Sequence, residues 1–296
     1  MRASGFNMFR ISTVISLCEI PHTGGQVKIG RQDQRSSAIS TSNQDTILVR
    51  GHDLAGELIG KIGFTDHIWL LITGALPSAA QRRVLDATLV AIAEHGLVPS
   101  VQASRMTLAA APEALQGAVA AGILGCGSVV LGSSEAAGRF FADIAAVVAG
   151  GVSVEAAATR IVGEYRAAKR AIPGYGHPLH KGADPRASCL LRIGVETGTS
   201  GRHAEIAQAV EALLPALVGR PLGLNVSGAI PAVLLDAGYP LLALKGVPIL
   251  ARTAGLVAHL LEEQQRPIGF VMSHAAAQAI AYDGDAPADF VPSTDA

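Results

Sequence analysis

Apolar residues recur at helical spacing along most of this chain. Val84, Leu85, Leu89 and Ile92, for example, fall on one face of a helix over residues 78–95. Glycine, proline and capping residues mark the breaks between such stretches. The pattern predicts a helix that starts at residues 99–100, and others over residues 53–60, 65–74, 78–95, 112–131, 133–149, 153–170, 187–194, 202–217, 228–237 and 247–264. Only residues 47–50 favour a short strand or an extended entry, so we expect an all-α protein.

Residues 112–131 differ from the other predicted helices because they are small and apolar on nearly every side. Glycine stands at positions 117, 122, 125 and 127. A helix that is apolar all round is usually buried where another helix approaches it closely. We therefore expect this segment to lie in the core.

Composition and charge agree with a helical protein that binds small molecules. Aromatic residues make up only 4% of the chain, and the formal net charge is −1. No long-range field favours nucleic acid or an anionic membrane, so a few placed Arg and His side chains must hold any anionic ligand. No run of about 18 uninterrupted apolar residues predicts a membrane-spanning helix. Three widely spaced cysteines suggest neither a disulfide framework nor a zinc site, and they favour a cytoplasmic location.

The two ends of the chain read as polar extensions. Residues 1–26 carry a short apolar stretch over positions 11–17. A signal peptide is one interpretation, but the stretch is short and no A-x-A site follows. A mobile arm, or a start codon placed too early with Met8 as the true start, fits better. We predict a flexible arm over residues 1–44 and a polar tail over residues 282–296.

The least helical segment is IPGYGHPLHKGADPR, residues 172–186, which presents His177, His180, Lys181 and Arg186 close together. Its glycines would let the backbone approach a ligand, although a solvated surface turn fits the composition equally well. The prolines keep His177 and His180 off a common helical face, and we predict no metal site.

Three other features allow a structural and a functional interpretation. Arg252 lies within an apolar helix, so it is either paired in a buried salt bridge or directed into a ligand cleft. His95, beside Gly96, suits a helix C-terminus electrostatically. The glycine-rich run over residues 125–132 follows a helix rather than a strand, which argues against a nucleotide-phosphate loop.

GYGHPLHKGADPR, residues 174–186, closely resembles the signature of the citrate synthase family, a Gly-x-Gly-His loop followed by Asp-Pro-Arg. RGHDL at 50–54, LITGALP at 71–77, EHGLVPS at 94–100, ARTAGLVAH at 251–259 and RP at 266–267 resemble further family segments in the same order. The short length, GSVVLG at 127–132 and the PLHK that follows His177 most resemble the short bacterial citryl-CoA lyases.

The resemblance implies a homodimer of helical subunits. Each subunit would have a large domain, residues 45–132 and 239–281, and a small domain, residues 133–238, that closes over the ligand. His95, Arg186 and Arg252 would bind the carboxylates and keto oxygen of oxaloacetate, or the matching part of citrate, with Arg266 acting across the dimer interface. His177 would contact the keto oxygen, which becomes the citryl hydroxyl, and accept its proton.

The resemblance also places a CoA thioester, as substrate, against the loop formed by Ile172, Pro173, Gly174, Tyr175 and Gly176. No separate cofactor is expected.

Two positions depart from the family pattern. Val130 replaces a His that stabilises the enol of acetyl-CoA, and Ser227 replaces an Asp that acts as the base on the acetyl methyl group. Losing a positioned acid–base group typically costs about 10²–10⁴ in rate, so ordinary citrate synthesis is not expected.

Three hypotheses remain. The first is a lyase that cleaves citryl-CoA or a related 3-hydroxyacyl-CoA to oxaloacetate and acetyl-CoA, with a water, Ser227, His180 or backbone N–H groups in the lost roles. The second is an enzyme of the same fold for a different acyl-CoA. The third is a non-catalytic protein that binds citrate, oxaloacetate or a CoA ester.

Overall fold

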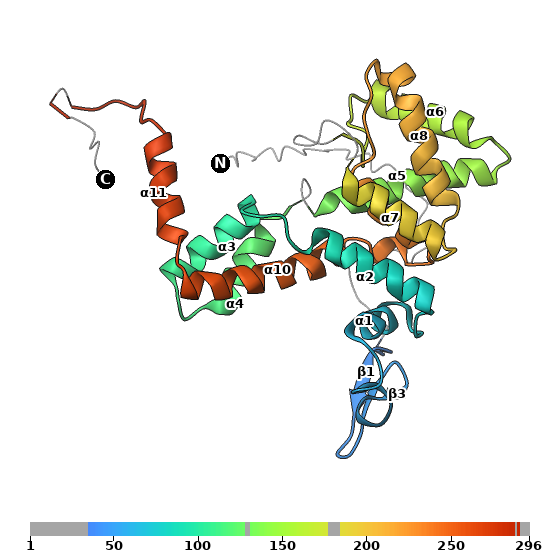
Figure 1. Ribbon diagram of the computed structural model, residues 1–296, viewed down its shortest axis with the longest axis horizontal. Helices are drawn as coiled ribbons and strands as arrows, with labels where there is room; N and C mark the ends of the chain where they lie inside the picture. The colour runs from blue at the N-terminus through green and yellow to red at the C-terminus, as the bar shows by residue number, and fades with distance from the viewer. Residues whose placement is uncertain (1–34, 128–130, 177–183, 288, 291–296) are drawn as a thin grey trace, which may run out of the picture. The chain divides into compact units, whose positions relative to one another are not determined.

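A computed structural model of the protein describes residues 35–127, 131–176, 184–287 and 289–290. The elements below lie within the unit that begins at Ile39. The predicted all-α class is confirmed, since helices dominate and the strands of the described part form one small sheet (Figure 1).

That sheet is antiparallel, with strand order β1-β2-β3. Strand β1 (Ser40–Ser42) pairs with β2 (Ile47–Val49), which pairs with β3 (His52–Asp53). The strand expected near residue 47 is therefore present. The prediction of a flexible arm up to residue 44 is wrong for residues 40–42, because their backbone pairs with β2.

The helices fall into two groups, and within each group the helices pack against one another (Figure 1). Helices α3 (Pro99–Ala110), α4 (Leu115–Leu124), α10 (Gly246–Gln265) and α11 (Gly269–Ala279) form the first. The second contains α5 (Gly132–Ala149), α6 (Val154–Ala167), α7 (Pro185–Glu196), α8 (Arg202–Val218) and α9 (Val226–Asp236). Helix α2 (Ala79–Ala93) contacts α10 of the first group and α7 and α9 of the second. The predicted large and small domains, with boundaries at 132 and 239, remain a prediction.

The remaining elements are short. Asp53 caps η1 (Leu54–Leu58) by accepting hydrogen bonds from the backbone N–H groups of Ala55 and Gly56. Helix α1 (Phe64–Thr73) follows, and η2 (Leu241–Ala243) precedes α10. The main core lies around α5, α8 and α9, where Phe140 and Phe141 are fully buried, and Phe140 meets the ring of Tyr165 edge to face at 5.2 Å.

Two sequence expectations about helices need correction. The apolar helix predicted over residues 112–131 is only α4, and it exposes Leu115 and Leu124 instead of being buried all round. Helix α11 had no counterpart in the predicted pattern. Glu263 fixes its first residue, since its carboxylate accepts from the Gly269 N–H at 2.8 Å and from Arg105 Nε at 2.6 Å.

One stretch, Leu241–Gln265, is long and apolar enough to cross a membrane by length and composition, with a mean hydropathy of 1.5. The sequence does not predict a membrane-spanning helix here by the criterion of about 18 uninterrupted apolar residues, because Lys245 and Arg252 interrupt the stretch. Its helix α10 packs against α2, α3 and α4 and buries Arg252 and Glu263. Those contacts are typical of a core helix in a globular protein.

Helices α2 and α10 cross at Gly255. A Cβ atom there would lie 2.1 Å from the carbonyl oxygen of Ala93, the last residue of α2. Because backbone cannot move aside as a side chain can, only glycine fits at this crossing. The crossing therefore fixes how closely the end of α2 approaches α10.

We expect Gly255→Ala to lower the free energy of unfolding by about 1–3 kcal/mol, the usual cost of overpacking. Gly163→Ala is the matched control, because Gly163 is an exposed glycine in α6 with nothing near its would-be Cβ. That change should raise stability by roughly 0.5–1 kcal/mol. Urea unfolding of both variants measures the difference, and equal effects would contradict the assigned crossing.

Candidate active site

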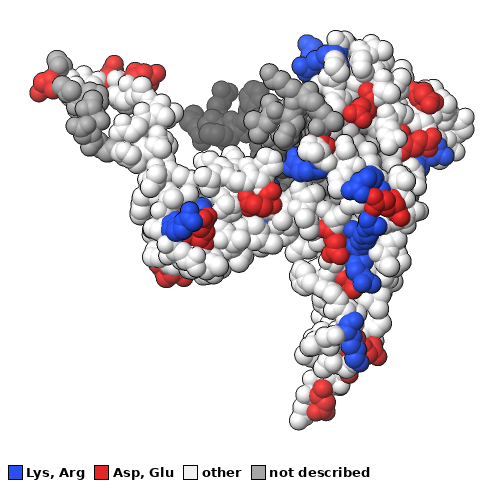
Figure 2. Space-filling model, viewed as in Figure 1, with Lys and Arg blue, Asp and Glu red and all other residues white. Residues whose placement is uncertain are grey.

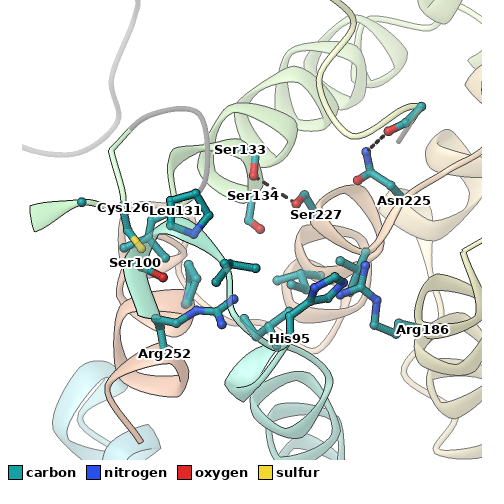
Figure 3. Close-up of a pocket in the computed structure, with 18 residues that line it drawn as sticks. His95, Ser100, Cys126, Leu131, Ser133, Ser134, Arg186, Asn225, Ser227 and Arg252 are labelled. Carbon is teal, nitrogen blue, oxygen red and sulfur yellow. Dashed lines mark hydrogen bonds between the residues drawn. The ribbon is translucent and has the colours of Figure 1, made fainter. Parts of the chain in front are cut away.

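A cavity of about 450 Å³ lies where the first turns of four helices meet (Figure 3). Ser100 comes from α3, Ser133 and Ser134 from α5, Arg186 from α7 and Ser227 from α9. Helix beginnings carry partial positive charge and unpaired N–H groups, so they attract anions. Among the described residues that line the cavity, none is Asp or Glu. The cavity is therefore suited to an anionic ligand.

Two of these helix beginnings are capped by side chains and two are not. The Asp184 carboxylate caps α7 and the Asn225 side chain caps α9. Helices α3 and α5 begin after Val98 and Leu131, which make no side-chain cap hydrogen bond. At the start of α5, Gly127 O accepts from the backbone N–H groups of Leu131, at 3.0 Å, and Gly132, at 3.3 Å.

Asp184 orients Arg186 within the cavity wall. Its two carboxylate oxygens accept from Arg186 Nε at 3.0 Å and Nη2 at 2.9 Å, and Oδ2 also accepts from the backbone N–H of Val226 at 3.0 Å. One carboxylate thus ties the start of α7 to the start of α9. Burial by itself raises the pKa of Asp184, but the hydrogen bonds from Arg186 and Val226 outweigh it and leave that pKa below its ordinary value.

Glu94 shapes the turn that presents His95. Its carboxylate accepts from the backbone N–H groups of His95, at 2.8 Å, and Gly96, and it lies 2.9 Å from His259 Nε2 on α10. Burial by itself raises the pKa of Glu94, but His259 and these two N–H groups outweigh it, so the pKa is lowered. His95 is thereby fixed relative to α10, the helix that carries Arg252.

Arg252 is a buried cation in the cavity wall. Its side chain is only 8% exposed, and its Nε and Nη1 atoms have no hydrogen-bond partner within the described residues. Figure 3 shows Arg252 and Arg186 on opposite sides of the cavity, with His95 between them. Of the two sequence interpretations of Arg252, the structure agrees with direction into a ligand cleft rather than with a buried salt bridge.

Ser227 lies at the end of the cavity formed by α5 and α9. Ser133 Oγ donates a hydrogen bond to Ser227 Oγ at 3.0 Å (Figure 3). Because Ser227 accepts this bond, its own hydroxyl proton is left for another acceptor. Both hydroxyls are neutral, and the described lining offers no carboxylate that could act as a base beside them.

The loop predicted to contact CoA is fixed by backbone contacts with the start of α9. Gly174 O accepts from the Asn225 N–H at 2.9 Å, and the Gly176 N–H donates to Gly223 O at 2.8 Å. Gly174 has a φ of +86°, and a Cβ there would lie 2.8 Å from Gly228 Cα, so only glycine permits this crossing.

The same loop borders a second cavity of about 550 Å³. Ile172, Tyr175 and Gly176 line it, whereas Pro173 and Gly174 do not. The Tyr175 hydroxyl donates to Ala207 O at 2.8 Å, and burial raises the pKa of this tyrosine well above its ordinary value. The charged residues that line this cavity are all cationic: Arg166, Lys169, Arg170 and Arg220. Gly176 lines both cavities, which makes them neighbours.

The structure brings His95, Arg186, Arg252 and Ser227 together in one cavity, as the sequence interpretation required. Arg266 does not line that cavity. It follows α10, its side chain is 81% exposed, and its carbonyl accepts from Arg105 Nη2 at 3.1 Å. His177, His180, Lys181 and Val130 lie outside the described residues. Within the described residues, no group of three or more His, Cys, Asp or Glu side chains is arranged to hold a metal ion.

Sequence reasoning missed several polar residues of the cavity. Ser133 and Ser134 gave no signal because their helix start becomes a site only when α5 packs beside α9. Ser100 was quoted within EHGLVPS without a role, and Asn225, which caps α9, was not singled out. For Ser100 and Ser227, the available signal was a polar residue close to the start of a predicted helix.

The chain matches the family described as citrate synthase, C-terminal domain, over residues 79–269. Citryl-CoA lyase from Hydrogenobacter thermophilus superposes on it with a TM-score of 0.76 and 33% sequence identity, covering 87% of this chain and 97% of that one. A comparison with curated proteins finds no match.

Two more distant structures share the fold. ATP citrate lyase from Methanothrix soehngenii, determined with citrate and coenzyme A, has a TM-score of 0.68 and 23% identity, covering 90% of this chain and 44% of that one. Citrate synthase from Thermotoga maritima has a TM-score of 0.59 and 19% identity, covering 78% and 60%. The predicted citrate synthase-like fold is confirmed.

We expect Asp184→Asn to lower the free energy of unfolding by about 2 kcal/mol at neutral pH, since it weakens charge-assisted hydrogen bonds. The pKa of Asp184 lies below its ordinary 3.8, so its contribution is full above that value and is lost as the pH falls through the lower folded value. The gap between wild type and variant in denaturant unfolding should therefore shrink on acidification.

Asp143→Asn is the control for this prediction, because burial raises the pKa of Asp143. Replacing a carboxylate whose charged form is penalised in the fold should cost nothing near pH 7. A gap for Asp184→Asn that widens with acid would contradict the assigned role of Asp184.

Proposed function

Because the chain belongs to the citrate synthase family, we propose that it is a carbon–carbon lyase that cleaves citryl-CoA, or a related 3-hydroxyacyl-CoA, to oxaloacetate and acetyl-CoA. The observation that carries this proposal is the composition of the first cavity. Its described lining contains two Arg, one His and the starts of four helices, and it contains no Asp or Glu. The 33% identity to a citryl-CoA lyase over 97% of that enzyme supports the lyase over other family reactions.

In the proposed complex, His95, Arg186 and Arg252 hold the carboxylate groups of the citryl unit. Arginine stays charged at all relevant pH values and pairs well with planar carboxylates. Arg186 Nε and Nη2 already donate to Asp184, so Nη1 is the nitrogen that would donate to a ligand. Arg252, with no protein partner among the described residues, supplies the stronger contact.

The proposed reaction is a cleavage without change in oxidation state overall. A base accepts the proton of the citryl hydroxyl, the oxygen electrons form the keto group of oxaloacetate, and the adjacent carbon–carbon bond breaks. Its electron pair passes to acetyl-CoA as the enolate, which then takes a proton on carbon. The resemblance assigns the first proton transfer to His177, a residue type suited to it near neutral pH.

The enolate would form at the Ser133–Ser227 end of the cavity. There the Ser227 hydroxyl lies beside the positive ends of α5 and α9, and a positive helix end together with a hydroxyl donor suits a developing oxyanion. We therefore propose Ser227 as a hydrogen-bond donor, in place of the carboxylate base that the family pattern has there.

The second cavity would receive the nucleotide part of CoA. Its four cations, Arg166, Lys169, Arg170 and Arg220, suit the phosphate groups, and its apolar lining suits the adenine ring. Gly176, shared by both cavities, marks the path that the pantetheine arm would follow. In this proposal, Ile172, Tyr175 and Gly176 are the residues of the 172–176 loop that would contact CoA, because they line the second cavity.

We also propose a homodimer formed through α4, α10 and α11. Leu124 of α4 is 84% exposed and Phe270 of α11 is 69% exposed, and Val257, Leu261, Val271 and Ile280 are exposed as well. Figure 2 shows few charges over these helices on the face in view. Exposed apolar side chains on several neighbouring helices are typical of an interface between copies. Arg266 lies at the junction of α10 and α11, where it would reach the partner subunit.

A cytoplasmic location remains our proposal. Cys126 and Cys189 are both free thiols, which fits a reducing compartment.

The decisive test of the lyase is release of oxaloacetate from citryl-CoA, read through malate dehydrogenase and NADH. We expect Arg252→Ala to lower kcat/KM by at least about 100-fold, since it removes a charged contact to the acid. Arg220→Ala should instead raise KM by about 10-fold with little change in kcat, because it weakens only nucleotide binding.

Arg160→Ala, at an exposed arginine of α6 outside both cavities, is the matched control and should match wild type. No release by wild type, with citrate still raising the Tm, would favour a binding protein or an enzyme for another CoA ester.

For the dimer, light scattering after size-exclusion chromatography should give about twice the mass of one chain. Leu124→Glu should produce monomers, because it places a charge on the exposed apolar side of α4. Val90→Glu on α2 is the control, since Val90 is equally exposed but lies outside α4, α10 and α11. A monomeric wild type at micromolar concentration would refute the dimer.

A further inference from the structure

Ser100 and Arg252 both lie buried in the cavity wall, and each has polar atoms without a hydrogen-bond partner among the described residues. Ser100 is only 2% exposed, and its Oγ has no hydrogen-bond partner within the described residues. The same is true of Nε and Nη1 of Arg252. Leaving a buried polar group unpaired costs folding free energy, so native proteins rarely do it without a reason. Two such groups in one cavity indicate a ligand that completes their hydrogen bonds.

The two residues belong to helices in close contact. Gly122 of α4 allows this contact, since a Cβ there would lie 2.7 Å from the side chain of Leu256 and 2.9 Å from Ser100 O. Leu256 comes one helical turn after Arg252, so the start of α3 lies beside the Arg252 part of α10. Figure 3 shows Ser100 on the same side of the cavity as Arg252.

We infer that the Ser100 hydroxyl and the Arg252 guanidinium bind the same carboxylate group of the acid, a role that neither the sequence pattern nor the resemblance gives to Ser100. Ser100 is the second residue of the twelve-residue helix α3, whose start has no side-chain cap. A carboxylate at this point would meet a hydroxyl donor, the guanidinium and the positive end of the helix together. The inference rests on the proposed acid-binding cavity.

A second buried serine in the same helix shows the contrast. Ser104, one turn after Ser100, donates its hydroxyl to Ala118 O at 2.7 Å and so joins α3 to α4. The Ser104 hydroxyl serves the fold, whereas Ser100 lines the cavity and its hydroxyl has no acceptor among the described residues. Replacing each by alanine should therefore have opposite consequences.

The test measures citrate binding by calorimetry and the Tm of the ligand-free protein, for wild type, Ser100→Ala, Ser100→Cys and Ser104→Ala. We expect Ser100→Ala and Ser100→Cys, which keeps the volume but not the strong donor, to weaken citrate binding by about 10-fold or more. Their ligand-free Tm should equal or exceed that of wild type. Ser104→Ala should lower the Tm and leave the citrate Kd unchanged.

An unchanged citrate Kd in both Ser100 variants would overturn the inference and leave the proposed function standing. If wild type binds neither citrate nor oxaloacetate, the acid-binding cavity itself fails, and the proposed function fails with it. A Tm loss in Ser100→Ala equal to that in Ser104→Ala, without loss of affinity, would assign the hydroxyl to the fold.

Discussion

The site depends on one constraint, which is that the positively polarised starts of several helices lie close together. Helices α3, α5, α7 and α9 direct their positive ends at one cavity, and the described lining contains no carboxylate to offset them. Asp184, just behind the wall, satisfies the start of α7 and one N–H of α9. The starts of α3 and α5 have no such cap. The fold thus holds the positive ends of four helices around one cavity before any ligand arrives, which is what preorganised anion sites do.

Sequence reasoning located most of the helices because each boundary has a local cause. Ser78 and Gln81 form the capping box of α2, and Asp184 and Pro185 begin α7. The extent of α4 and the existence of α11 were missed for a different reason. Helix α11 starts where Glu263, six residues earlier, meets Arg105 from a distant segment, and no local pattern contains that contact.

The residues of the candidate site also fall into those that sequence motifs predict and those that only the packing of the fold reveals. His95, Arg186 and Arg252 were found because their residue types and neighbours match a known motif. The Ser133–Ser227 hydrogen bond joins residues 94 positions apart, and its existence depends on how α5 packs against α9. The unpaired state of Ser100 is likewise a property of packing, since serine at a helix start is ordinarily satisfied locally. Composition reveals which groups are present, but only the fold reveals which of them lack partners.

Gly176 borders both cavities, and this has a consequence for the order of events on the protein. A ligand that fills both cavities is bivalent, so its two ends raise each other's effective concentration, and it binds more tightly than either half alone. For the proposed reaction, breaking the carbon–carbon bond separates oxaloacetate from the part of the molecule that reaches the second cavity. Oxaloacetate then keeps only the contacts of the first cavity, so the reaction itself weakens the binding of the acid that the CoA portion had strengthened.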